Sequence, residues 1–171
     1  MRVIKVGAGG GEIDWHDALK DLRADDVLLL EPGFYNLPQG ITLADITIKG
    51  TGTLPEDTTI LGYVSVSPDS CYVTLENLCI NTIKDRNSLF VPVEANTYLS
   101  LRNCVIKGTN SDTAAIAANG KITLELYSTK IVNGYAYAKD SNAKIDDGYS
   151  GASSLVKGPT VTPGGDKTEA D

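Results

Sequence analysis

Aromatic side chains are scarce in this chain, so its core has to be built from aliphatic residues. Aromatics make up 6% of the 171 residues, with one Trp and two Phe, whereas hydrophobic residues together make up 42%. That apolar content can fill a packed core, and a chain of this length is expected to form one domain.

Long apolar runs are also missing. No stretch approaches the roughly 18 apolar residues of a membrane-spanning helix. Residues 1–6 lead straight into glycines, without the apolar segment of a signal peptide. We therefore expect a protein that is cytoplasmic or part of a larger assembly.

Positive charge is in short supply, because 15 Lys and Arg residues face 22 Asp and Glu residues, for a net charge of −7. An acidic surface repels phosphate groups, so neither nucleic acid nor an anionic membrane is expected as a partner. The three cysteines, Cys71, Cys79 and Cys104, are odd in number and lack metal-ligand spacing. We expect free thiols in a reducing compartment, and neither a metal nor a cofactor.

An internal repeat occupies the middle of the chain. Residues 73–80, 99–106 and 124–131 align with one another in steps of 26 and 25 residues, and residues 41–48 align as a fourth copy 32 residues upstream. Apolar and polar positions alternate in each copy, as in a strand with one buried face. A polar column interrupts each copy where we expect the chain to bend; it consists of Asp45, Asn77, Asn103 and Ser128.

The apolar positions of the four copies define the expected core. They form the columns Ile41/Val73/Leu99/Leu124, Leu43/Leu75/Leu101/Leu126, Ile46/Leu78/Cys104/Thr129 and Ile48/Ile80/Ile106/Ile131. This alignment places Cys104 inside and Cys79 outside, so Cys79 is expected to be the more reactive of these two thiols.

A repeat of about 25 residues with several short strands is typical of a β-helix coil. Strand-like residues 59–61, 89–93 and 114–117 lie between the copies and are expected to form another face of the same coil. A leucine-rich repeat is excluded, because no unit carries a helix pattern or the Asn or Cys of that repeat. The sequence thus predicts an all-β, right-handed parallel β-helix, a solenoid of about five coils.

The two ends of the chain differ from the repeat. Residues 14–22 have the pattern of a short amphipathic helix, with Asp14 as N-cap and Asp17 in the first turn. This helix is expected to cap the apolar end of the solenoid. We therefore divide the chain into an N-terminal strand and capping helix (1–25), the β-helix coils (26–147) and a disordered C-terminal tail (148–171), which has little apolar content.

Four features follow one another along the chain: the capping helix, the strand and Pro-Gly turn of residues 26–35, residues 46–52 and the Leu-x-Asn-x-x-Ile coils. In these features the chain resembles the pectin lyase-like β-helix superfamily, over about residues 1–147. The resemblance implies polysaccharide as the ligand class. It implies no particular reaction, because this fold hosts lyases, hydrolases, epimerases, phage tailspikes and non-catalytic modules.

The catalytic residues of polygalacturonase-like members are not found. Those enzymes have paired aspartates, a His and an Arg-x-Lys motif, whereas the single histidine here is His16, on the capping helix, and no Arg-x-Lys occurs. The adjacent aspartates 25–26 and 146–147 lie at the two ends of the coil stack, where we interpret them as turn or strand-end residues. Tyr127, Tyr135 and Tyr137 are interpreted as a group that covers the C-terminal end.

The outward positions of the aligned strands give the candidate site. They form the columns Glu76/Arg102/Tyr127, Thr74/Ser100/Glu125 and Lys49/Asn81/Lys107. From these we select five candidate ligand-facing residues, Glu76, Arg102, Lys107, Glu125 and Tyr127. Glu76 and Arg102 are expected to form a cross-strand ion pair roughly 5 Å apart.

Two functions are compatible with this pattern. The first is a non-catalytic module with a structural role or a weak binding role toward polysaccharide or another protein. The alternative is a minimal polysaccharide-acting enzyme, either a lyase, an epimerase or a glycoside hydrolase. An enzyme needs two carboxylates near a basic residue, whereas the outward charges here alternate in sign. The first function is therefore the expectation.

Overall fold

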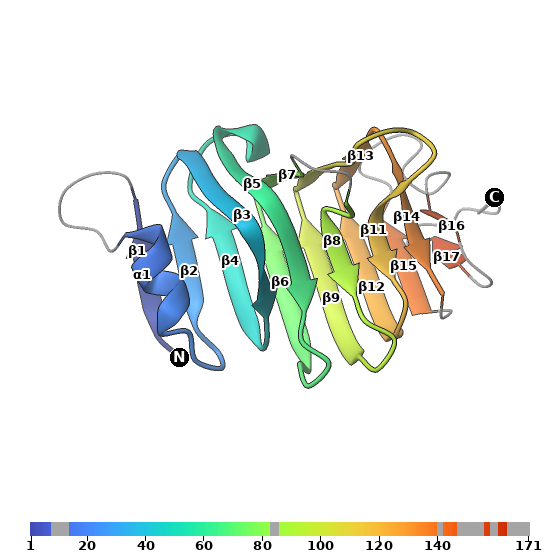
Figure 1. Ribbon diagram of the computed structural model, residues 1–171, viewed down its shortest axis with the longest axis horizontal. Helices are drawn as coiled ribbons and strands as arrows, with labels where there is room; N and C mark the ends of the chain where they lie inside the picture. Colours follow the sequence, from blue (N-terminus) through green and yellow to red (C-terminus); the bar gives the residue numbers. More distant parts are fainter. Residues whose placement is uncertain (8–13, 83–85, 140–141, 147–155, 158–160, 164–171) are drawn as a thin grey trace.

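The computed structural model describes residues 1–7, 14–82, 86–139, 142–146, 156–157 and 161–163. They form a right-handed parallel β-helix of about five turns, which confirms the predicted fold class. Figure 1 shows the coils stacked from the N-terminal helix at one end toward the C-terminal strands at the other.

The residues described form strands, one α-helix and one 3₁₀ helix. In order they are β1 (Val3–Val6), α1 (Trp15–Lys20), β2 (Val27–Leu30), β3 (Gly33–Leu43), β4 (Ile46–Gly50), the 3₁₀ helix η1 (Pro55–Asp57), β5 (Thr58–Val66), β6 (Tyr72–Glu76), β7 (Cys79–Asn81), β8 (Leu89–Val91), β9 (Asn96–Arg102), β10 (Val105–Lys107), β11 (Ala114–Ala118), β12 (Lys121–Tyr127), β13 (Lys130–Val132), β14 (Tyr135–Ala138), β15 (Asn142–Asp146), β16 (Val156–Lys157) and β17 (Val161–Pro163).

Sheet A has eight parallel strands in the order β1-β2-β4-β6-β9-β12-β15-β17. Its register pairs Leu75 with Leu101 and Leu101 with Leu126, as the repeat predicts. Leu28 and Ile48 continue the same column toward the N-terminus. All five side chains are almost completely buried, so this inward column runs through most of the solenoid.

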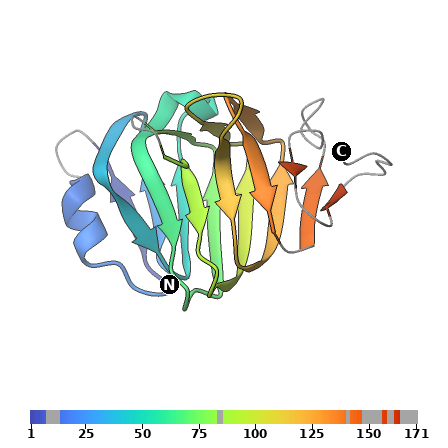
Figure 2. The same ribbon diagram turned by 45° about the vertical axis from the view of Figure 1, so that its right-hand side comes forward.

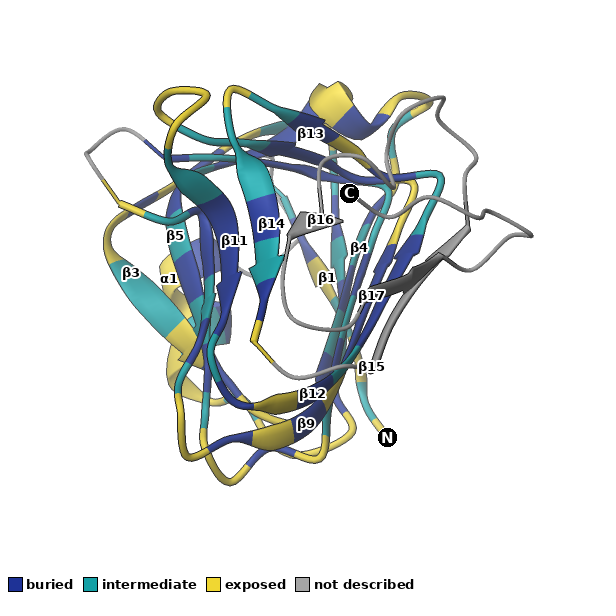
Figure 3. Cartoon of the chain, turned by 90° about the vertical axis from the view of Figure 1, so that its right-hand side faces the viewer, coloured by how far each residue is buried: buried dark blue, intermediate teal, exposed yellow. Residues whose placement is uncertain are grey.

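Sheet B forms the other two sides of the coil. Its order is β13-β10-β7-β5-β8-β11-β14-β16, with β3 paired to β5. The first half of the long strand β5 pairs with β7 and its second half pairs with β8. The next coil therefore has two separate strands where this coil has one. Figure 2 shows sheet B in front of sheet A in an oblique view of the stack. Seen along the solenoid, sheet A, the β13 side and the β11–β14 side enclose a buried interior (Figure 3). The expected second face is thus confirmed.

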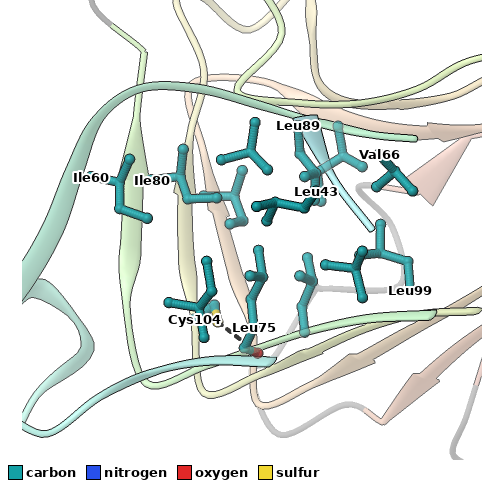
Figure 4. Packing of buried hydrophobic residues seen from close by; sticks show 14 of the residues in the cluster. Leu43, Ile60, Val66, Leu75, Ile80, Leu89, Leu99 and Cys104 are labelled. Atoms are coloured by element: carbon teal, nitrogen blue, oxygen red, sulfur yellow. Dashed lines mark hydrogen bonds between the residues drawn. The ribbon is translucent and has the colours of Figure 1, made fainter. Parts of the chain in front are cut away.

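Aliphatic side chains from both sheets fill that interior. Ile60 and Ile80 reach it from the first part of sheet B, Leu43 and Leu89 from the second part, and Leu75 from sheet A (Figure 4). The predicted columns through Ile80, Ile106 and Ile131 and through Leu78, Cys104 and Thr129 are also buried. Figure 4 also shows the Cys104 thiol donating to the Leu75 carbonyl oxygen at 3.3 Å.

The fourth repeat copy, residues 41–48, is aligned wrongly by the sequence. In the structure Ile46 pairs with Val73 and Ile48 pairs with Leu75, whereas Leu43 pairs with Val66 in sheet B. The chain turns from sheet B into sheet A between β3 and β4, so the segment belongs to two faces. The alternation of apolar residues indicates which side chains of a strand face inward, but it does not indicate to which sheet the strand belongs.

The polar column marks a real corner for three of its four members. Asn77, Asn103 and Ser128 follow β6, β9 and β12 with φ of 53°, 50° and 48°. The Asn103 amide donates to Oδ1 of Asn77 at 3.0 Å, and the Asn77 amide donates to the carbonyl oxygens of Gly50 and Gly52. Gly50 is required there, because a Cβ would lie 2.1 Å from the Asn77 carbonyl oxygen.

Asp45, the fourth expected member of that column, lies at a different corner. It precedes β4, and its carbonyl oxygen accepts from the N–H of Asp25, which precedes β2. Its carboxylate accepts from the N–H groups of Cys71 and Tyr72 at 2.6 and 3.1 Å. Asp45 therefore fixes the turn into sheet A, whereas the asparagines fix the turn out of it.

The N-terminal end agrees with the predicted helix. The Asp14 carboxylate caps α1 by accepting from the His16 N–H at 3.0 Å. Trp15 and Ala18 of this helix are buried, and the Trp15 ring lies edge-on to Tyr35 at 5.2 Å.

Arg2 ties the first strand to the coil stack. Its guanidinium donates to the buried carboxylate of Asp26 at 2.9 and 2.5 Å, and the Arg23 N–H donates there at 2.8 Å. The Arg2 hydrogen bonds, the Arg23 hydrogen bond and the positive charges hold the pKa of Asp26 below its usual value despite burial. Asp25 and Asp26 are strand-end residues, as predicted.

Most of the segment predicted to be a tail, 148–171, lies outside the described residues. Its described parts are two strands, β16 and β17, which pair with β14 and β15. The coils therefore extend beyond residue 147, the predicted boundary. Few apolar residues are needed to add a short strand when the backbone of a preceding coil offers hydrogen bonds.

Candidate functional site

The outer face of sheet A brings four of the five candidate residues together. The register runs from Lys49 to Glu76, Arg102 and Tyr127 in one column. The neighbouring column runs through Thr74, Ser100 and Glu125. Both columns contain the residues that the sequence predicts, and the register extends them, with Lys49 and Asp146 added to the first column and Lys144 to the second.

Lys107, the fifth candidate, is on the other sheet. It pairs with Asn81 and Val132 in sheet B, whereas Lys49, expected in the same column, belongs to sheet A. The wrong alignment of residues 41–48 produced this error, because it equated Ile48 with Ile80. Lys107 therefore does not contribute to the candidate site.

The charges on the outer face of sheet A pair differently from the prediction. Glu76 lies 3.4 Å from the Lys49 ammonium, and in the part of the chain that the structure describes no ion pair joins Glu76 to Arg102. Arg102 donates instead to the Ser100 hydroxyl at 3.2 Å, and its guanidinium lies 5.0 Å from the centre of the Tyr127 ring. This stacking keeps the guanidinium exposed beside an aromatic surface.

Glu125 is the centre of the site. Its side chain is on an outer face, yet the residue is only 6% exposed. Tyr98 donates its hydroxyl to Oε1 of Glu125, and Tyr127 donates to Oε2 at 2.8 Å. One carboxylate thus joins the tyrosines of β9 and β12 and fixes the position of both rings.

The Tyr98 hydroxyl is strongly affected by this contact. The hydrogen bond to Glu125, burial and the nearby negative charge raise the pKa of Tyr98 to about 12. The residue as a whole is nevertheless 39% exposed. Tyr98 therefore presents an accessible aromatic surface while its hydroxyl stays protonated and bound.

Tyr72 extends the aromatic surface toward the N-terminal coils. It is in register with Tyr98 on the adjacent strand. Its hydroxyl donates to the Asp25 carboxylate at 3.1 Å, and burial together with that contact raises its pKa. Tyr72 and Tyr98 thus lie side by side with their hydroxyls bound toward opposite ends of the solenoid.

Sequence reasoning missed Tyr72 and Tyr98, although a signal was present. Both tyrosines stand directly before the aligned segments, as Tyr-Val-Thr-Leu and Tyr-Leu-Ser-Leu. Extending the alignment by one residue would have added an outward aromatic column. The predicted aromatic group of Tyr127, Tyr135 and Tyr137 is wrong, because Tyr127 belongs to sheet A and the other two to β14 of sheet B.

The expectation that Cys79 is more accessible than Cys104 is also wrong. Cys79 is in an outward column, but it is as completely buried as Cys104, and Cys71 is exposed. η1 packs over β7 and covers Cys79. Burial raises the pKa of both thiols, to about 12 for Cys104. The inward and outward assignment is right, but it did not account for a covering loop.

Within the described residues, no three His, Cys, Asp or Glu side chains gather in a way that could hold a metal ion. None of the described helices has the length and apolar content needed to cross a membrane. No protein-family model, curated protein or solved structure matches the chain.

Proposed function

We propose that the protein is a non-catalytic β-helix module that binds carbohydrate on the outer face of sheet A. The observation that carries the proposal is the pair of tyrosine hydroxyls on the buried Glu125 carboxylate. Tyrosine rings offer an apolar face with a polar edge, which suits the faces of sugar rings. Rings that are already fixed lose little entropy when a ligand binds.

The surroundings of these rings support an extended ligand. Tyr72 and Tyr98 occupy neighbouring coils, which are roughly 4.8 Å apart. Polar groups of Thr74, Ser100 and Arg102 lie next to them in the same face. A glycan that runs along the solenoid would meet an aromatic and a hydrogen-bonding group at successive coils. The resemblance to pectin lyase-like β-helices favours polysaccharide as the ligand class.

The state of the two carboxylates favours binding over catalysis. Glu76 is paired with Lys49, and Glu125 accepts two hydroxyls. A glycosidase needs one carboxyl that donates a proton and a second roughly 5–10 Å away. Both carboxylates are therefore engaged by side chains of the chain itself.

A glycan panel tests this proposal. The full chain is titrated with uronate and neutral polysaccharides, with and without Ca²⁺, and binding is measured by calorimetry alongside assays for new reducing ends and unsaturated products. We expect binding without turnover. Tyr98→Ala should weaken binding about two- to tenfold by removing a stacking surface. Tyr137→Ala, on sheet B, is the matched control and should leave it unchanged.

The same assays would reveal the alternative, a minimal polysaccharide-acting enzyme. Product formation that is abolished by Glu76→Gln or Arg102→Ala would show that the protein is an enzyme and not a non-catalytic binding module. Absence of binding to every glycan of the panel would contradict the carbohydrate proposal.

A further inference from the structure

Two hollows lie beside neighbouring strands of sheet B, away from the sheet A site. The first lies between α1 and β3, with a volume of about 400 Å³, and is lined by His16, Leu19, Lys20 and residues 37–41. The second has a volume of about 310 Å³ and is lined by Tyr63, Ser65, Arg86, Asn87 and Phe90.

Tyr63 connects these hollows. Its hydroxyl donates to the Gln39 carbonyl oxygen at 2.7 Å. Its ring lies against Gly40, which has φ of +69° and where a Cβ would meet the ring at 2.1 Å. The ring therefore rests on the wall of the first hollow while lining the second. We call the two hollows together the sheet B groove.

The lining of the sheet B groove combines apolar side chains with positive charge. Leu19, Leu37 and Ile41 line the part near α1. Lys20 stands at this end, and the Arg86 guanidinium lies 4.6 Å from the centre of the Tyr63 ring at the other. None of the described lining residues is a carboxylate, although the chain has a net charge of −7.

The acidic side chain of Asp17 pairs only weakly with Lys20. Asp17 lies 3.7 Å from the Lys20 ammonium, and both side chains are exposed, at 68% and 77%. Exposed pairs of this kind contribute little stability and are readily exchanged for another partner. Lys20 and Arg86 can therefore both face an incoming acidic group.

We propose that the sheet B groove binds an acidic, extended peptide segment of a partner protein. An apolar side chain of that segment enters the hollow beside α1, and a carboxylate pairs with Arg86. Charge complementarity and the aliphatic lining carry the proposal, because hydroxylated sugars gain little from Leu and Ile side chains. Pro38 offers no N–H, and the register with β5 breaks between Leu37 and Ile41, so recognition occurs through side chains rather than by an added strand.

The test uses a peptide of alternating Asp or Glu and Leu with blocked ends, titrated into the nitrogen-labelled full chain. Amide resonances of residues 37–41 and 63–65 should shift. Arg86→Gln should weaken binding about tenfold, since it removes a charged hydrogen bond, and Lys20→Gln should weaken it about twofold to threefold. Lys130→Gln, which removes an exposed positive charge on β13 outside both sites, is the matched control and should leave the affinity unchanged.

Three results would overturn the proposal. One is equal binding of a peptide with Lys in place of its acids. A second is unchanged affinity of Arg86→Gln, shown to have the unfolding midpoint of the unmodified chain. The third is tighter binding of polygalacturonate than of the peptide with the same amide shifts, which would assign the groove to an acidic glycan.

Discussion

At the scale of single residues, the outer face of sheet A depends on Glu125. A carboxylate that is 6% exposed normally carries a penalty for leaving water, and here two tyrosine hydroxyls compensate for it. The same contacts make the two rings immobile. Structural support and the proposed binding surface therefore rest on one side chain.

A pH titration tests the contact between Tyr98 and Glu125. Because the pKa of Tyr98 is raised from 10.0 to about 12 in the folded chain, the contact stabilises the fold below pH 10.0 and this contribution is lost as pH rises toward 12. The difference in unfolding free energy between the unmodified chain and Tyr98→Phe should shrink over that interval. A difference that stays constant with pH would mean that Tyr98 ionises normally.

Thiol labelling tests the covering of Cys79 by η1. Cys71 is exposed, whereas Cys79 and Cys104 are fully buried and have raised pKa values. The native chain should therefore react rapidly with one equivalent of a thiol reagent, at Cys71, and with three after unfolding. Cys71→Ser should abolish the rapid phase. Rapid labelling of Cys79 in that variant would show that η1 leaves it accessible.

At the scale of elements, the asparagine corner sets where sheet A ends. Non-glycine residues with positive φ are strained unless Asn or Asp occupies the position. Asn77 meets this requirement and also bonds two carbonyl oxygens of the preceding coil. The corner therefore links local backbone conformation to the stacking of coils.

Substitutions of Asn77 separate these two contributions. Asn77→Ala should lower the unfolding free energy by about 2–4 kcal/mol, through backbone strain and lost hydrogen bonds. Asn77→Gly loses the same hydrogen bonds but is not strained at positive φ, so it should lower the unfolding free energy by about 1–2 kcal/mol less than Asn77→Ala. Urea unfolding measures both. Equal effects of Ala and Gly would mean that the positive φ carries no strain.

The sequence predicted elements well where the repeat is regular. Residues 73–131 have steps of 26 and 25, and their columns match the observed register. It failed for residues 41–48, where β3 leaves sheet B and β4 enters sheet A, because both strands alternate in the same way. It also missed the cover of η1 over Cys79, since packing of a loop onto a strand leaves no periodic signal.

For the site, the sequence predicted which residues face outward but not their partners. Glu76, Arg102, Glu125 and Tyr127 do share one face. Whether Arg102 turns toward Glu76 or toward Tyr127 depends on rotamers, and the strand pattern leaves these undetermined. The joining of two tyrosines by Glu125 is likewise a matter of side-chain geometry.

At the scale of the whole molecule, stability comes from contacts between successive coils. Each coil in a solenoid contacts only its neighbours, so a cavity in a central coil weakens two interfaces. Leu101 lies in such a coil, between Leu75 and Leu126, and is completely buried.

Leu101→Ala should lower the unfolding free energy by about 2–5 kcal/mol, through lost contacts and the cavity left behind. Denaturant unfolding at an unchanged m-value is the measurement. Leu54→Ala, at a position that is 59% exposed, is the control and should change stability little. A loss as small as that of the control would contradict the assignment of Leu101 to the central core.

The most direct test of the central proposal is to map a bound glycan on the molecule. Amide resonances of the nitrogen-labelled full chain are followed during titration with the tightest ligand of the panel. The account predicts that the shifted residues cluster on β6, β9 and β12, around Tyr72, Tyr98 and Glu125. Shifts that cluster on sheet B and leave these three strands unchanged would contradict it.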